Sequence, residues 1–175
     1  MPLPIRRERP TFPQGYGLPD TDDDLLEWAA VESRLIESKH YWLATVRPDG
    51  RPHLIPRWGV WVDHAFYYDG SPTTRHARNA EANPACSLSL EDGQHAVILE
   101  GTSVATRADA DGLGDLLAAA FAKYHDDGYS PGRDSWAGDD GGGLRVFRPV
   151  TGMAWFSFPV DATRFVWPAG DAAQP

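Results

Sequence analysis

Cysteine is nearly absent from this chain, and long apolar runs are missing altogether. Cys86 is the only cysteine among 175 residues, which excludes an intramolecular disulfide and a cysteine-rich zinc site. No apolar run approaches the roughly 20 residues of a membrane span. The start of the chain, residues 1–10, is rich in Arg and Pro and has no apolar signal core. We therefore expect a cytoplasmic protein that does not enter membranes.

Basic residues are also few relative to acidic ones. Lys and Arg number 16 against 25 Asp and Glu, so the formal net charge is −9. Neutralising nucleic-acid phosphates requires clustered positive charge, which argues against a nucleic-acid partner. The length and the 42% hydrophobic content predict one globular domain with a packed core.

Lysine occurs only at Lys39 and Lys123, so arginine supplies almost all of the positive charge, and aromatic residues are plentiful, with seven Trp. Arginine binds planar anions through two parallel hydrogen bonds, and Trp offers a flat stacking surface. This composition favours a site for a planar, anionic small molecule. A GC-rich genome and an aromatic core give the same composition, so both interpretations stay open.

The order of sequence patterns predicts an N-terminal arm over 1–19, one domain over 20–170 and a tail over 171–175. A first helix is expected from Thr21 to about Ser38, because Asp22–Asp24 in its first turn favour the positive end of the helix dipole. Two more helices are predicted, one over 73–82 that is capped by Thr73 or Thr74 and one over 113–124, and residues 125–143 form a long polar loop. The predicted strands are 40–46, 52–62, 65–68, 85–90, 95–106, 144–148, 152–158 and 162–167.

Short turns join most of these strands, so the sheet should be largely antiparallel. We expect a mainly β fold, a closed or nearly closed barrel with helices outside, because closure leaves few unpaired edges.

The first candidate site is the start of the second helix. Unpaired N–H groups and a partial positive charge at a helix N-terminus attract anions, and hydroxyl and cationic side chains surround this one. The alternative is an ordinary capped surface helix. The candidate residues are Thr73, Thr74, Arg75 and His76.

Two further candidates lie in strands. In the long strand, Pro56 indicates an edge or a gap in pairing, and Gly59 leaves room for a flat ligand to approach the backbone. The alternative there is an aromatic core strand with a bulge. In the closing strands, a hairpin would bring Trp155 and Arg164 together. The alternative is that Trp155 lies in the core and Arg164 on the surface.

Taken in order, residues 21–167 resemble the pyridoxamine 5′-phosphate oxidase-like split-barrel superfamily, and most closely its flavin- and deazaflavin-dependent oxidoreductases. The resemblance implies a Greek-key-like, six-stranded FMN-binding split barrel that forms a homodimer, with the cofactor at the interface. The segments that carry it are Leu43–Thr45, Asp49–Pro52, Arg75–Pro84, Glu100–Gly101 and the closing stretch 148–167.

By this resemblance, three groups of residues bind the cofactor. One strand runs along the ring, a helix start holds the phosphate, and two residues near the C-terminus reach the cofactor from the same or the other subunit. In that order they are Ile55, Pro56, Arg57, Trp58 and Gly59; Thr73, Thr74, Arg75 and His76; and Trp155 and Arg164.

The chain departs from the family pattern at two places. His76 stands where the family usually has Lys, which removes a fixed charge from the phosphate site. Residues 162–166 lack the His-Asp pair with which vitamin B6 oxidases bind their substrate. Pyridoxamine phosphate oxidase activity itself is therefore not expected.

The resemblance predicts an oxidoreductase that transfers hydride between F420 or FMN and a small organic substrate. In such enzymes the cofactor supplies the chemistry, so no catalytic side chain is required. The Arg-rich composition slightly favours F420. The alternative is a split-barrel protein that binds a flavin or haem without turnover. The six histidines show no metal-ligand spacing, and Cys86 in a strand is expected to be an inert buried thiol.

Overall fold

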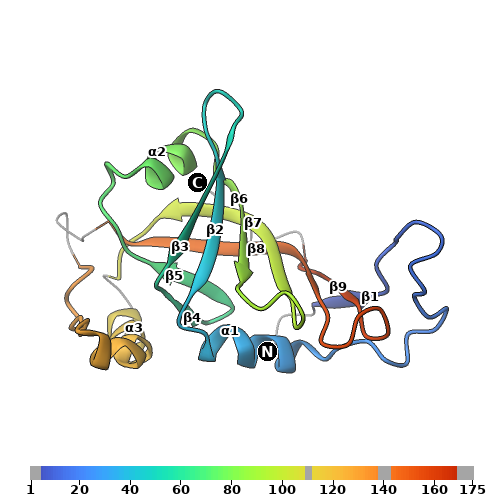
Figure 1. Cartoon of the computed structure of the whole chain (residues 1–175). Coiled ribbons are helices and arrows are strands. Elements are labelled where there is room, and N and C mark those ends of the chain that lie inside the picture. The colour runs from blue at the N-terminus through green and yellow to red at the C-terminus, as the bar shows by residue number, and fades with distance from the viewer. Residues whose placement is uncertain (1–4, 109–111, 138–142, 169–175) are drawn as a thin grey trace.

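The computed structural model describes residues 5–108, 112–137 and 143–168, which form one antiparallel sheet with three α-helices (Figure 1). The helices are α1 (Trp28–Glu37), α2 (Arg75–Ala82) and α3 (Leu113–Phe121), and α3 continues into the 3₁₀ helix η1 (Ala122–Asp127). The strands are β1 (Arg6–Glu8), β2 (Tyr41–Val46), β3 (Pro52–Arg57), β4 (Val60–Val62), β5 (Ala65–Tyr68), β6 (Ala85–Leu90), β7 (Val97–Ala105), β8 (Arg145–Ala154) and β9 (Thr163–Val166).

Pairing closes the sheet into a barrel. The order β8-β7-β6-β2-β3 continues through the short break between β3 and β4, and β4 returns to β8 through β5. Counting β3 and β4 as one bent strand, the ring has six members. The predicted mainly β, antiparallel barrel is therefore confirmed.

Two hydrophobic cores lie on opposite faces of the barrel wall. The first fills the barrel interior and includes Tyr41, Leu43 and Phe66, with Val31 and Leu35 of α1 packed against it. The second lies outside β4, β5 and β8, where α3 and η1 cover the wall. Its members include Val60, Ala65, Leu117, Phe121, Tyr124, Trp136 and Val146.

Strand β8 belongs to both parts of the sheet. Its first residues pair with β5 and its last with β9, while its whole length pairs with β7. The sequence predicted two strands here, 144–148 and 152–158, and Pro149 falls in the gap between them. The structure has one strand, because a register shift opposite Glu100 and Gly101 accommodates the proline, which has no N–H to donate.

The first helix begins later than predicted. It starts at Trp28, after Glu27, rather than at Thr21. The Thr21 carbonyl accepts a 2.6 Å hydrogen bond from the Arg9 guanidinium, which fastens this segment to the N-terminal residues. The acidic run therefore forms turns instead of the first turn of a helix.

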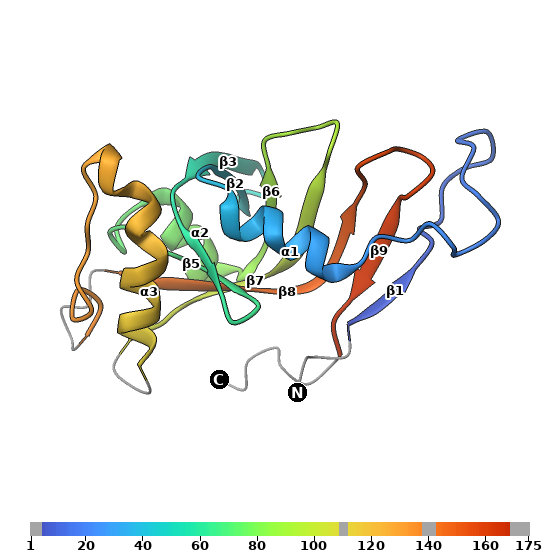
Figure 2. The same ribbon diagram turned by 90° about the horizontal axis from the view of Figure 1, so that it is seen from below.

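The predicted N-terminal arm contains a strand. Residues Arg6–Glu8 form β1, which pairs with β9. Figures 1 and 2 show β1 and β9 extending from the barrel as a lobe on the side away from α3. The predicted 52–62 strand is interrupted at residues 58–59, and part of the predicted loop 125–143 is the end of η1. Residues 138–142 of that loop, and the tail 171–175, lie outside the described residues.

In the part of the chain that the structure describes, no helix combines the length and the apolar character needed to cross a bilayer.

Candidate functional site

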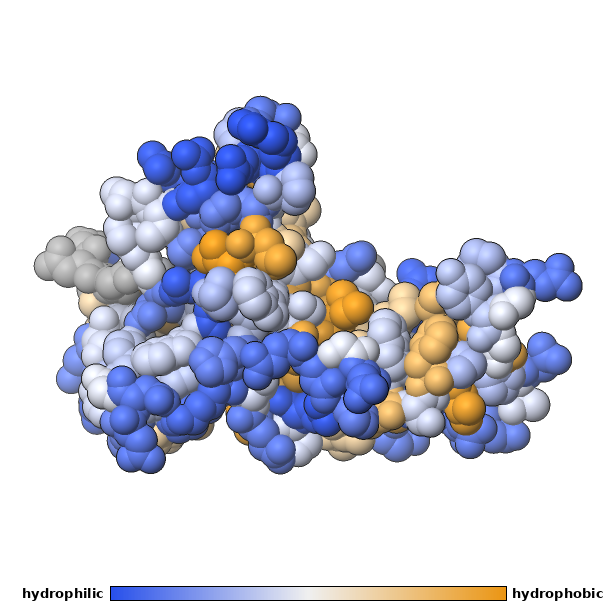
Figure 3. Space-filling model, in the orientation of Figure 1, coloured by the Kyte–Doolittle hydropathy of each residue, from blue (hydrophilic) through white to orange (hydrophobic). Residues whose placement is uncertain are grey.

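A row of directly opposed residues crosses the outer face of the barrel. Register places Trp42 opposite both Pro56 and Ser89, Ser89 opposite Ile98, Ile98 opposite Met153, and Met153 opposite Arg164. Two of the predicted site residues, Pro56 and Arg164, thus mark the ends of one row. Figure 3 shows apolar residues on one face of the molecule, along the recess between the barrel and the β1–β9 lobe.

Strand β3 presents its residues to two sides. Because β3 is paired with β2 in register, Pro56 lies beside exposed Trp42, whereas Ile55 packs against the barrel core. Arg57 extends toward the turn before α2, where its Nη2 donates to the Asp69 carbonyl.

The start of α2 is a compact turn of hydroxyl groups. The Ser71 and Thr73 hydroxyls lie 2.7 Å apart, and the Thr74 hydroxyl donates to the Ser71 carbonyl at 2.8 Å. Thr74 precedes the helix but makes no side-chain cap bond to it. The predicted side-chain cap is therefore wrong, and the first-turn N–H groups of α2 are not taken up by a capping side chain.

His76 is buried beneath this turn, with 4% of its surface exposed. Its Nε2 lies 3.3 Å from the Thr74 hydroxyl, whose proton already goes to Ser71, so Nε2–H donates to that hydroxyl. Burial, followed by the nearby Arg57 and Arg145 charges, lowers the pKa of His76 to about 4. His76 is therefore neutral near pH 7 and positions Thr74.

Arg57 lies against the same turn. A side chain at Gly70 would lie 3.2 Å from Arg57 Nη2 and 3.5 Å from His76 Nε2, so glycine there lets the two side chains converge. The Arg57 Nε atom is buried and has no hydrogen-bond partner among the described residues. A buried guanidinium nitrogen without an acceptor is the kind of donor that a phosphate oxygen would satisfy.

Two more buried nitrogen atoms lie at the turn end of the β2–β3 hairpin. His53 Nδ1 and Arg47 Nε are also buried without a partner in the described part of the chain. The pKa of His53 is lowered by burial and then by the charges of Arg47 and Arg75. Within residues 5–108, 112–137 and 143–168, no carboxylate pairs with Arg47, Arg57 or Arg75. The region therefore has uncompensated positive charge, which suits an anionic ligand.

Gly59 is required by internal packing. A Cβ at this position would lie 2.3 Å from the Phe66 ring and 2.6 Å from the Tyr67 carbonyl oxygen. The Phe66 ring thus fills the space beside Gly59 in which a flat ligand was predicted to approach the backbone. Neighbouring Trp58 stacks on Tyr124 with ring centroids 4.9 Å apart.

Trp155 and Arg164 lie diagonally across the β8–β9 hairpin, since Arg164 is opposite Met153. Their side chains have separate partners. Arg164 pairs with Glu8 at 3.1 Å, and the Trp155 ring contacts Phe158 edge-on. Figure 1 shows this hairpin on the other side of the molecule from α2, so one chain does not bring these two residues to the α2 turn.

The sequence analysis missed residues both at the α2 turn and in a separate pocket. His53 has no distinguishing neighbour in sequence, and only strand pairing brings it near Arg75. Phe12, His95 and Phe158 line a pocket with Trp155, although they come from three separate segments. The closely spaced aromatic residues from Trp155 to Phe158 were the one signal for that pocket.

Metal and thiol chemistry find no support here. Among the described residues, no three His, Cys, Asp or Glu side chains are grouped as a metal site would need. Cys86 is buried, and burial raises the pKa of its thiol to about 12. The prediction of a buried thiol is confirmed, and the raised pKa makes it inert.

Comparison with known proteins identifies the family. The family model described as pyridoxamine 5′-phosphate oxidase matches residues 28–139. The chain belongs to this family. No curated protein sequence matches it.

Solved structures support the same fold. An F420 reductase is 25% identical, with a TM-score of 0.50, and the match covers 67% of this chain and 91% of that one. HutZ, the heme storage protein from Vibrio cholerae, is 21% identical, with a TM-score of 0.53 and coverage of 69% and 88%. The conserved hypothetical protein Rv2991 from Mycobacterium tuberculosis is 19% identical, with a TM-score of 0.55 and coverage of 84% and 88%. The predicted split barrel is thereby confirmed.

Proposed function

We propose that this protein is a homodimeric oxidoreductase that transfers hydride between a bound flavin-type cofactor, F420 or FMN, and a small organic substrate. The observation that carries the proposal is the group of unpaired cationic side chains at the α2 start, centred on the buried, unpartnered Nε of Arg57. Membership of the family and the similarity to an F420 reductase support a flavin-type cofactor.

The α2 turn would hold the phosphate of the cofactor. Arg57 and Arg75 would supply charged donors, and the free N–H groups at the α2 start would complete the cradle with Thr73. Thr74 and His76 would not contact the phosphate as charged donors. Because the Thr74 proton is committed to Ser71 and His76 is neutral, these two shape the turn instead of adding charge.

The outer face would hold the ring. Trp42 of β2 and Pro56 of β3 form an exposed, flat, apolar surface at one end of the cross-sheet row, and Arg57 follows Pro56 directly on β3. Trp155 and Arg164 lie too far along the sheet to complete this site within one chain. We propose that they reach it from a second copy related by a two-fold axis.

The cofactor, when bound, supplies the hydride chemistry. The protein's part is to fix the phosphate, orient the ring and exclude water from its reactive face. No side chain in this arrangement is required as an acid or a base.

A cofactor titration tests the proposal. Purified protein is titrated with FMN and with F420, following tryptophan fluorescence and visible absorbance. We expect saturable binding of at least one of them, followed by oxidation of the reduced cofactor when an organic acceptor is added. If neither cofactor binds, the proposal is lost.

A second candidate is storage of a flavin or haem without turnover. The neutral side chain of His76, at the position where the family usually has Lys, favours it because the phosphate then loses one fixed charge. The same titration separates the two, since a storage protein would bind its ligand but never accelerate its oxidation by an acceptor.

A further inference from the structure

One concavity near the β1–β9 lobe lies away from the α2 turn. It is a pocket of about 640 Å³, lined by four aromatic side chains, His95, Gln94 and Gly93. Pockets of a few hundred to about 1,000 Å³ suit small organic ligands. Its aromatic members are Phe12, Trp155, Phe156 and Phe158.

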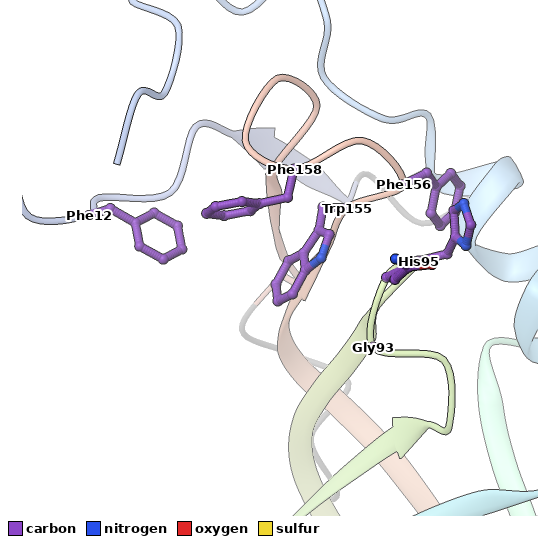
Figure 4. Close-up of a pocket in the computed structure, with 7 residues that line it drawn as sticks. Phe12, Gly93, His95, Trp155, Phe156 and Phe158 are labelled. Carbon is purple, nitrogen blue, oxygen red and sulfur yellow. The ribbon is translucent and has the colours of Figure 1, made fainter. Parts of the chain in front are cut away.

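Three segments far apart in sequence build this pocket. Figure 4 shows Phe12 reaching in from the N-terminal segment, toward Phe158 and Trp155 of the β8–β9 hairpin. The ring centroids of Phe12 and Phe158 are 5.8 Å apart, and those of Trp155 and Phe158 are 5.4 Å apart, both edge-to-face. Edge-to-face packing leaves ring faces open to a further aromatic group.

The N-terminal segment is held in place by Arg9. Its guanidinium donates to the carbonyls of Val160 at 2.7 Å and Ala162 at 3.2 Å, and also to Thr21 at 2.6 Å. These bonds join the segment that carries Phe12 to the hairpin that carries Phe158. Arg9 is therefore a positioning residue for the pocket, although its own side chain is not part of the lining.

The lining favours a neutral ligand. Among the lining residues that the structure describes, none is Asp, Glu, Lys or Arg. His95, at the rim, is paired through Nδ1 with Asp92 at 2.9 Å. A charged ligand would have to give up its hydration without an unpaired counter-charge in return. Gln94 and His95 offer hydrogen bonds for one polar substituent.

We propose that this pocket binds the organic substrate, and that the substrate is a neutral, planar aromatic molecule with one polar substituent. The assignment as a substrate site rests on the proposed function. Trp155, which we place against the cofactor of the partner subunit, is also part of the pocket wall. The bound aromatic molecule is thereby next to the cofactor ring of the partner and does not share its phosphate cradle.

The test uses 2-naphthol as the probe and full-length protein without cofactor, studied by isothermal titration calorimetry. Wild type should bind one equivalent per chain. Phe12→Ala and Phe158→Ala should each weaken binding by about fivefold, the scale of one lost aromatic contact. Arg9→Gln, which leaves every lining side chain in place, should also weaken it. Leu116→Ala, at an exposed apolar residue on α3, is the matched control and should bind as wild type does.

A charged analogue tests the preference for a neutral ligand, and competition with the cofactor tests whether the two sites are separate. 2-Naphthoate, the same ring system with a carboxylate, should bind more weakly than 2-naphthol. Saturating FMN or F420 should leave 2-naphthol bound. Absence of 2-naphthol binding, equal affinity in all variants, or displacement by the cofactor would each overturn the proposal. Failure of FMN and F420 to bind, with 2-naphthol binding intact, would instead overturn the proposed function and leave an aromatic-ligand site.

Discussion

His76 illustrates how burial changes what a side chain contributes. Its pKa falls from 6.5 to about 4, so between these values the unfolded chain binds a proton that the folded chain does not. Stability is therefore retained above about pH 6.5 and is lost as pH falls toward 4.

The prediction is that His76→Gln reduces this acid sensitivity. Between pH 7.5 and pH 5, wild type should lose about 2 kcal/mol of unfolding free energy more than the variant does, following the linkage between pKa shift and stability. Urea unfolding at the two pH values measures the difference. His40→Gln, at an exposed histidine, is the control and should keep the wild-type dependence. If the unfolding free energies of wild type and His76→Gln depend equally on pH, the lowered pKa of His76 is wrong.

Arg75 offers a sharper test of the phosphate cradle. It is exposed at the first residue of α2 and has no carboxylate partner among the described residues. Arg75→Ala should weaken the binding of FMN or F420 by about 1–3 kcal/mol, the scale of a lost charge-assisted hydrogen bond. Fluorescence titration measures the affinity. Arg133→Ala removes another exposed arginine, one that is paired with acidic residues, and should not change the affinity. Unchanged affinity in Arg75→Ala would mean that the phosphate binds elsewhere.

Between elements, one hydroxyl joins η1 to the break between β3 and β4. The Tyr124 hydroxyl accepts from the Gly59 N–H at 3.0 Å and donates to the Lys39 carbonyl at 2.7 Å. Burial raises its pKa to about 12, so it remains protonated and able to donate.

Tyr124→Phe should therefore destabilise the fold. Loss of the hydroxyl leaves the buried Gly59 N–H without a partner, at a cost of about 1–3 kcal/mol. Thermal or urea unfolding measures it. Tyr16→Phe removes a hydroxyl from an exposed ring and serves as the control, with no expected change. A Tyr124→Phe variant as stable as wild type would show that water or a rearranged turn satisfies this group.

The barrel elements were predictable because their signals are local. Apolar alternation in Tyr41–Val46 and the Asp49–Gly50 turn identify a hairpin from sequence alone, and the structure has it. The start of α1 was not predictable, since a long-range bond from Arg9 to Thr21 removes the acidic run from the helix. The single long β8 depends on a register shift opposite Gly101, which no local pattern reports.

The residues of the candidate site were likewise predictable only where their signal is local. Thr73 to His76 were found because a turn followed by a helix start is a local pattern. The depth of His76 beneath that turn, and the proximity of Arg57, follow from the tertiary contact between the end of β3 and the turn before α2. The need for Gly59 was interpreted wrongly, because Phe66 is a neighbour only after β4 and β5 pair.

At the scale of the molecule, the outer sheet face leaves apolar side chains uncovered. Leu54 is 59% exposed, and Trp42, Val46, Ile98 and Val150 are also exposed. Apolar patches of this kind mark interaction sites. In the proposed homodimer, the partner lies against this face, and Trp155 and Arg164 of one chain reach the α2 turn of the other.

We expect wild type to sediment as a dimer of the 19.3 kDa chain, and Leu54→Glu to sediment as a monomer with reduced cofactor affinity. Burying the new carboxylate at the interface would be unfavourable without a partner charge. Leu116→Glu places the same charge on α3 and should remain dimeric. A monomeric wild type would remove the homodimer from the proposed function.

The two hydrophobic cores share one wall of the barrel, formed by β4, β5 and β8, and this affects how the protein unfolds. Neighbouring residues alternate between them, with Val146 in the outer core and Phe147 in the inner one, and likewise Val60 and Trp61. Neither core can open while the other remains intact, because each strand of the wall contributes to both. Melting followed by near-ultraviolet circular dichroism and by amide hydrogen exchange should therefore give a single cooperative transition, although the apolar interior is divided in two.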